Sequence, residues 1–143
     1  MELFAHKILT SEGKACEATE DGLNSAISNI PEGGTLFFPP EYISCTSSVN
    51  FSKRMQWIGS SRHGGIESSA NPIINITYTG PCSLLRDISI KATSTENSQT
   101  GILFSGAPLI RTYNLYILYP NIGLAKSGTG MVRVKMMGGA VDG

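Results

Sequence analysis

The hydrophobic pattern of the chain predicts one short amphipathic helix near its start. The apolar residues of this segment recur at the i, i+3, i+4 and i+7 spacing of one helical face, at Leu23, Ala26, Ile27 and Ile30. Asp21 stands where an N-cap is expected, and Pro31 disfavours continuation of the helix. We therefore expect a helix over residues 21–30 that buries a single face.

The rest of the chain alternates short apolar runs with polar, proline or glycine-containing turns, which is typical of β-strands. No second helix is indicated. The two-residue Asn-Gly and Asp-Gly turns of β-hairpins are nearly missing between the runs, so we expect the chain to wind as a coil and not to reverse. The expected strands cover residues 35–38, 42–43, 55–58, 73–78, 84–90, 102–104, 109–118, 122–125 and 131–136.

A loose repeat supports a coil. A polar residue precedes an apolar strand centre at Gln56, Asp87, Asn114 and Arg133, at intervals of 31, 27 and 19 residues. We expect these four residues to mark successive copies of the repeat. A repeat of that length, with two or three short strands in each copy, is what a parallel β-solenoid needs to bury its inward side chains on the next coil.

Three segments resemble the start of a known fold. They are residues 20–27 (Glu-Asp-Gly-Leu-Asn-Ser-Ala-Ile), 30–42 (Ile-Pro-Glu-Gly-Gly-Thr-Leu-Phe-Phe-Pro-Pro-Glu-Tyr) and 55–59 (Met-Gln-Trp-Ile-Gly). Their order is similar to that of pectate-lyase-like right-handed parallel β-helix proteins, most of all bacteriophage tailspikes, in which a short helix covers the first coil. Glu41 replaces the glycine usual at the Pro-Pro-Gly-x-Tyr corner, and the Asp-rich stretch before the helix is reduced to Glu20-Asp21.

The expected fold is therefore all-β, a right-handed parallel β-helix with a short N-terminal capping helix. Residues 1–34 form the N-terminal segment with that helix, and residues 35–143 form the coils. A cap is expected because an open solenoid end exposes apolar side chains and unpaired backbone groups. No comparable cap follows the last expected strand, so we expect the solenoid to be incomplete at its C-terminal end.

Charge and composition narrow the possible partners. The 143 residues contain 11 Lys and Arg against 11 Asp and Glu, which leaves no basic excess to drive binding of nucleic acid. No apolar run approaches the roughly 20 residues of a membrane helix, so no membrane insertion is expected. Residues 1–10 lack the apolar core of a signal peptide. The cysteines, Cys16, Cys45 and Cys82, are expected to be reduced and partly buried.

No catalytic set is apparent. Glycan hydrolysis needs two carboxyl groups about 5–10 Å apart, and only Glu67, Asp87 and Glu96 lie within the middle coils. We interpret Asp87 as a structural corner residue stacked on Asn114, and Glu67 and Glu96 as solvated loop residues. His6 and His63 are expected at the surface, the glycine-rich segment 59–65 is expected to be a turn, and no metal site or cofactor is indicated.

The candidate carbohydrate-binding residues are Arg111, Tyr113 and Tyr116. Alternation places Tyr116 outward between Leu115 and Ile117. Outward tyrosines on a long sheet can stack on sugar faces, while arginine reaches acidic groups. The alternative is that these tyrosines cover the flank of a neighbouring subunit or loop.

The resemblance implies the front part of a tailspike-like protein of the phage virion, often a homotrimer, that recognises and in many relatives cleaves a bacterial surface polysaccharide. One alternative is a fragment of a pectate-lyase- or polygalacturonase-like enzyme, extracellular by a route that the sequence does not encode. A further alternative is a non-enzymatic adhesive or structural β-solenoid. A fold alone does not carry an activity, so these three functions stay open here.

Overall fold

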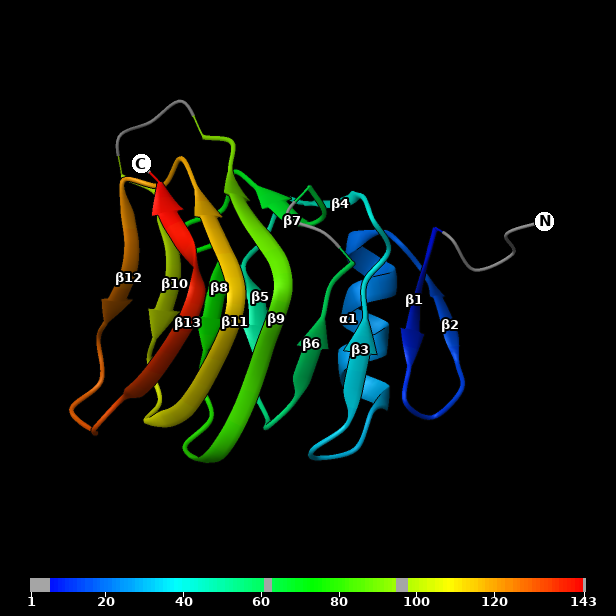
Figure 1. Cartoon of the computed structure of the whole chain (residues 1–143), viewed down its shortest axis with the longest axis horizontal. Helices are drawn as coiled ribbons and strands as arrows, with labels where there is room; N and C mark the ends of the chain where they lie inside the picture. Colours follow the sequence, from blue (N-terminus) through cyan, green and yellow to red (C-terminus); the bar gives the residue numbers. More distant parts are fainter. Residues whose placement is uncertain (1–5, 61–62, 95–97, 143) are drawn as a thin grey trace.

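Short strands stacked in parallel coils make up most of the structure, a computed structural model that describes residues 6–60, 63–94 and 98–142. The chain winds through about four turns of a parallel β-helix (Figure 1). Its elements in chain order are β1 (Lys7–Thr10), β2 (Ala15–Glu17), α1 (Glu20–Asn29), β3 (Thr35–Phe37), β4 (Tyr42–Cys45), β5 (Val49–Phe51), β6 (Gln56–Ile58), β7 (Gly65–Ser68), β8 (Ile74–Ile76), β9 (Gly80–Ala92), β10 (Thr100–Phe104), β11 (Pro108–Leu118), β12 (Ile122–Lys126) and β13 (Arg133–Asp142).

Each coil contributes to three faces. The front face holds β3, β6 and the first halves of β9, β11 and β13, which lie side by side with β1 and β2 in Figure 1. The second face holds β4, β7 and the second halves of the three long strands, because β9 pairs with β6 before its bend and with β7 after it. The third face is the sheet ordered β12-β10-β8-β5. All coil-to-coil pairs are parallel.

The predicted all-β parallel β-helix with one short helix is thus confirmed for the described residues. Four strands were not predicted: β1, β2, β5 and β7. β5 and β7 are only three and four residues long and lie among serines and glycines, so their periodicity is too brief to recognise. β1 and β2 form an antiparallel hairpin whose turn uses Gly13 at φ 81°, without an Asn-Gly or Asp-Gly pair.

Stacked apolar columns fill the interior. On the second face, Ile43, Ile66, Ile90 and Ile117 pair in register from coil to coil, and each is 0% exposed. Complete burial of one such side chain stabilises the fold by about 1.5–3 kcal/mol. Val141 continues the column in β13 but is 47% exposed, because no described strand lies beyond it. The column therefore stabilises the last described coil less than the coils before it.

Aromatic rings fill the widest part of the interior. Trp57 is fully buried, and its ring centroid lies 5.3 Å from that of Phe38 and 4.8 Å from that of Phe51. Leu36 and Leu85 pair with Trp57 from the coils on either side. Trp57 of the front face, Phe51 of the third face and Phe38, between β3 and β4, therefore form one aromatic centre in the first two coils.

Helix α1 covers the N-terminal end of this core with Leu23, Ala26 and Ile27, as its apolar stripe predicts. The predicted N-cap, Asp21, is wrong. Thr19 is the cap, since its backbone is extended and its Oγ1 accepts a hydrogen bond of 3.1 Å from the Gly22 backbone N–H. Asp21 lies instead in the first turn, where a negative charge favours the positive end of the helix dipole.

Glu20 joins the cap to the first coil, a role that the sequence did not suggest. Its carboxylate accepts hydrogen bonds from the backbone N–H groups of Ser47 (2.9 Å) and Thr46 (3.1 Å) and from the Thr46 hydroxyl (3.0 Å). These bonds, the one from Ser47 first, lower the pKa of the Glu20 carboxyl. The carboxylate therefore fixes the turn between β4 and β5 against the start of α1.

We predict that Leu23→Ala lowers the free energy of unfolding by about 2–5 kcal/mol, because Leu23 is fully buried at the capped end and its truncation leaves a cavity. Urea denaturation followed by circular dichroism measures the change. Ser28→Ala, at an exposed position of the same helix, is the matched control and should change little. Equal effects of the two substitutions would contradict the capping role of α1.

We predict that Glu20→Gln destabilises the protein at about pH 7 by on the order of 1 kcal/mol, because the ionised carboxylate is the better acceptor for two backbone N–H groups. The folded-state pKa of Glu20 is depressed, so its contribution is present above the unfolded pKa and is lost as the pH falls through the folded pKa. Denaturation curves of the two proteins should therefore converge in acid. A constant difference at every pH would rule out the charge as its source.

Candidate functional site

Two outward rows cross the front face from strand to strand. Each row consists of residues that pair in register on successive strands and point away from the interior. The buried column of Trp57, Leu85 and Thr112 lies between the two rows. The first row consists of Thr35, Gln56, Leu84, Arg111 and Lys135. The second row consists of Phe37, Ile58, Arg86, Tyr113 and Met137.

Arginine and lysine side chains are concentrated on the β9, β11 and β13 strands of the front face. Arg86, Arg111 and Lys135 are exposed and occupy positions next to the half-buried Tyr113 in the register, and Arg133 lies at the start of β13. We call these five residues the cationic patch. Arg111 and Lys135 lie directly opposite each other on neighbouring strands, about 4.8 Å apart between backbones. The patch thus combines closely spaced positive charges with an aromatic ring.

The structure brings together two of the three predicted binding residues. Arg111 and Tyr113 both point outward on the front face. Tyr116 follows the bend of β11 and lies on the second face, half-buried between the buried Leu115 and Ile117, as alternation predicts. Its partners in the neighbouring strands are Ser89 and Ala140. Arg86 and Lys135 take its place beside Tyr113, and sequence reasoning missed both because only the register brings them to this face.

The uneven distribution of charge along the chain explains why the patch is basic although the protein is neutral. Residues 1–60 contain seven Asp and Glu against four Lys and Arg, whereas residues 61–143 contain four Asp and Glu against seven Lys and Arg. Because the coils stack in sequence order, most of the described carboxylates lie in the N-terminal coils and most of the described cations in the C-terminal coils. The C-terminal part of the front face is therefore its positive end.

A polar corner borders the patch where β9 and β11 bend. Asp87 and Asn114 both have φ of 52°, the left-handed conformation that Asp and Asn tolerate well. Asn114 Nδ2 donates a hydrogen bond of 3.0 Å to Asp87 Oδ1, and Arg86 Nε lies 3.4 Å from Asp87 Oδ2. The predicted stacking of Asp87 on Asn114 is confirmed, and it explains both residues without a catalytic role.

The other two residues that mark the predicted repeat, Gln56 and Arg133, are not equivalent to Asp87 and Asn114, so this part of the repeat is wrong. Gln56 pairs with Leu84, and Arg133 pairs with Leu109, so neither lies at the bend. The register places glycines beside the two true corner residues instead: Gly59, next to Ile58, aligns with Asp87, and Gly138, next to Met137, aligns with Asn114. Gly138 has φ of 70°, a conformation that glycine adopts without strain. A polar pattern cannot locate a corner that glycine occupies.

Glu67 is also placed differently from the prediction. It lies on β7, not in a loop, and is half-buried. Ser44 Oγ donates a hydrogen bond of 2.7 Å to its Oε1, and Lys91 Nζ lies 4.0 Å from its Oε2 and 5.2 Å from the centre of the Tyr42 ring. These contacts hold Glu67 within a polar network of the second face. The predicted loop position of Glu96 lies outside the described residues.

The histidines and cysteines show no arrangement that indicates catalysis among the described residues. His6 lies at the surface and contacts Glu41 at 3.2 Å, and His63 is exposed. The three cysteines are free, and Cys16 and Cys45 are buried. Burial, with a smaller contribution from the Glu20 carboxylate, raises the pKa of Cys45 to about 12, so its thiol stays protonated. Within residues 6–60, 63–94 and 98–142, no group of three or more His, Cys, Asp and Glu side chains could hold a metal ion.

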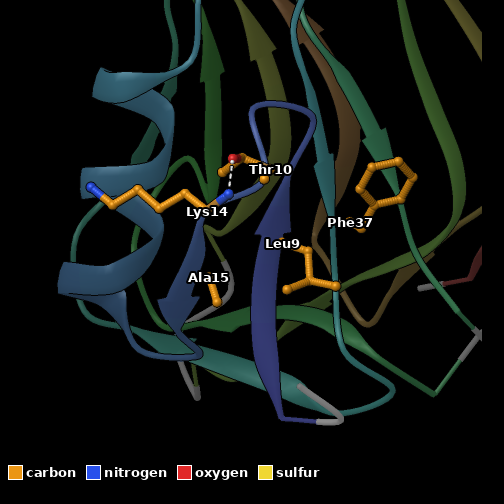
Figure 2. Close-up of a pocket in the computed structure, with 6 residues that line it drawn as sticks. Leu9, Thr10, Lys14, Ala15 and Phe37 are labelled. Carbon is orange, nitrogen blue, oxygen red and sulfur yellow. Dashed lines mark hydrogen bonds between the residues drawn. The ribbon is translucent and has the colours of Figure 1, made fainter. Parts of the chain in front are cut away.

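A shallow apolar cavity of about 300 Å³ lies at the other end of the front face. Leu9, Ala15 and Phe37 form its apolar wall, and the turn from Thr10 to Lys14 closes one side (Figure 2). The Lys14 backbone N–H donates a hydrogen bond of 3.1 Å to Thr10 Oγ1, which fixes this turn. The cavity was not predicted, because β1 and β2 were not recognised as strands.

Comparison with known proteins identified no relative: the chain matches no family model, no curated protein and no solved structure. Among the described residues, no helix has the length and apolar character needed to cross a membrane.

We predict that Asn114→Asp destabilises the protein at about pH 7 by on the order of 1 kcal/mol, since it replaces the amide donor that binds Asp87 by a second carboxylate. Chemical denaturation measures the loss. The exchanged pair Asp87→Asn with Asn114→Asp restores one amide and one carboxylate at the corner and should recover most of the stability. If the double variant is no more stable than Asn114→Asp, the hydrogen bond does not account for the effect.

Proposed function

We propose that the chain is the front part of a tailspike-like protein that recognises a bacterial surface polysaccharide through the cationic patch. The observation that carries this proposal is the placement of Arg86, Arg111 and Lys135 at positions next to Tyr113 on one exposed sheet face. None of these side chains belongs to the interior columns, and within the described residues only Arg86 among them forms an ion pair, with Asp87 at the neighbouring corner. The stacking of the coils therefore does not require the charges of Arg111 and Lys135. A binding role explains their combination.

The chemistry of the patch suits an acidic sugar. Guanidinium groups can bind a carboxylate through two parallel hydrogen bonds, and a tyrosine ring can cover the apolar face of a pyranose. The exposed position of Arg111 and Lys135 makes the electrostatic attraction sensitive to salt. Binding through this patch should therefore weaken as the ionic strength rises.

Recognition of the polysaccharide, and not its cleavage, is the function that these residues support best. Hydrolysis needs a pair of carboxyl groups that are available to the glycosidic bond. Asp87 is engaged by Asn114 and Arg86, and Glu67 by Ser44 and Lys91. The origin in a phage virion and the homotrimer are supported by the resemblance of residues 20–59 to the start of tailspike β-helices.

We predict that Arg111→Gln lowers the affinity for an acidic capsular polysaccharide about tenfold, which corresponds to the loss of about 1.4 kcal/mol. Biolayer interferometry on immobilised capsule or lipopolysaccharide preparations measures the change. Lys126→Gln removes an exposed charge from β12 on the third face and is the matched control, with little effect expected. Equal losses in the two variants would show that net charge, and not the patch, drives binding.

The same preparations test the alternatives to simple recognition. After incubation with the protein, an assay for reducing or unsaturated sugar ends should detect no release above the control without protein. Release of such ends would favour a hydrolase or lyase, whereas binding without release supports recognition alone. Absence of any binding would leave a structural solenoid as the better description and overturn the proposal.

A further inference from the structure

The second row of the front face extends beyond the patch to the N-terminal hairpin. Phe37 pairs with Leu9 of β1, and Leu9 pairs with Ala15 of β2. One continuous row therefore crosses seven strands, in the order Ala15, Leu9, Phe37, Ile58, Arg86, Tyr113 and Met137. These seven strands lie side by side in Figure 1, so the row runs along the solenoid axis.

The length of this row exceeds that of a single sugar. Seven strands are separated by six spacings of about 4.8 Å, which gives a row of about 29 Å. Its members remain accessible, since Phe37 is 43% and Met137 47% exposed, and Leu9, Ile58 and Tyr113 are half-buried. The row is thus long enough for several sugar units in an extended chain.

The two ends of the row differ in chemistry. The C-terminal end is the cationic patch. The N-terminal end is apolar, because Leu9, Ala15 and Phe37 line the cavity beside the hairpin turn (Figure 2). Neither outward row of the front face contains a carboxylate among the described residues. A ligand that matches both ends therefore has anionic groups over the patch and an apolar group at the cavity.

We infer that the whole front face is one extended site for an acidic polysaccharide that lies along the solenoid axis. Its carboxylate-bearing units contact Arg86, Arg111 and Lys135, and an apolar substituent, such as the methyl of an acetyl group, enters the cavity beside Phe37. This inference rests on the proposed function and deepens it by naming the charge of the ligand, its direction and a second contact region. The separation of that region from the patch makes the inference testable by itself.

Hyaluronan oligosaccharides of increasing length are suitable probes, since they alternate carboxylate-bearing and N-acetylated sugars. We predict that the affinity rises with length until the oligosaccharide spans the row and then levels off. Phe37→Ser should lower the affinity for the long oligosaccharides about fivefold and leave the short ones unchanged. Isothermal titration calorimetry measures both, with Phe37→Tyr as the conservative control and neutral dextran as the uncharged polymer.

The variants separate failure of this inference from failure of the proposed function. If Arg111→Gln weakens binding of every hyaluronan oligosaccharide but Phe37→Ser weakens none, the site is confined to the patch and the extended site is wrong. If dextran binds as tightly as hyaluronan, or if no hyaluronan oligosaccharide binds, the acidic ligand is wrong. If Arg111→Gln does not weaken binding of surface polysaccharide, the proposed function itself fails.

Discussion

The parallel register between successive coils is the constraint on which the rest of the structure depends. Side chains alternate along each strand, so a slip of one residue would turn an interior column outward and expose it to water. The column from Ile43 to Ile117 is completely buried in four coils and makes such a slip costly. The same register also determines which outward residues become neighbours. The contacts of the outward side chains themselves do not fix this pairing.

The two ends of the described solenoid show what this stacking contributes. At the first coil, α1 buries Leu23 and Ala26, and Glu20 binds the turn after β4. At the last described strand, Met136 and Val141 occupy interior positions but are 39% and 47% exposed. An interior side chain is therefore buried, and stabilises the fold, only where a neighbouring coil or the helix covers it. This dependence on neighbours is expected of a repeat fold.

The sequence predicts the parts of this fold that local patterns encode. The stripe from Leu23 to Ile30 indicates the helix, and the scarcity of hairpin turns among apolar runs indicates the coil. The alternation around Leu115 likewise places Tyr116 outward. Long-range pairing could not be predicted, because coils of unequal length hide the register. Three features depend on that pairing: the true positions of Gln56 and Arg133 in their coils, the contribution of Arg86 and Lys135 to the patch, and the cavity at Phe37.

Repulsion between like charges on the front face destabilises the fold, and this has a consequence for the proposed binding. Arg111 and Lys135 lie directly opposite each other, and like charges in such a pair destabilise a sheet by up to about 1 kcal/mol. No interior contact offsets that repulsion, since both side chains are exposed. Under the proposed function, an anionic ligand would replace this repulsion by two favourable contacts, and its binding would stabilise the register of β11 and β13. Ligand binding and the stacking of the coils would then be coupled through the same pair of strands.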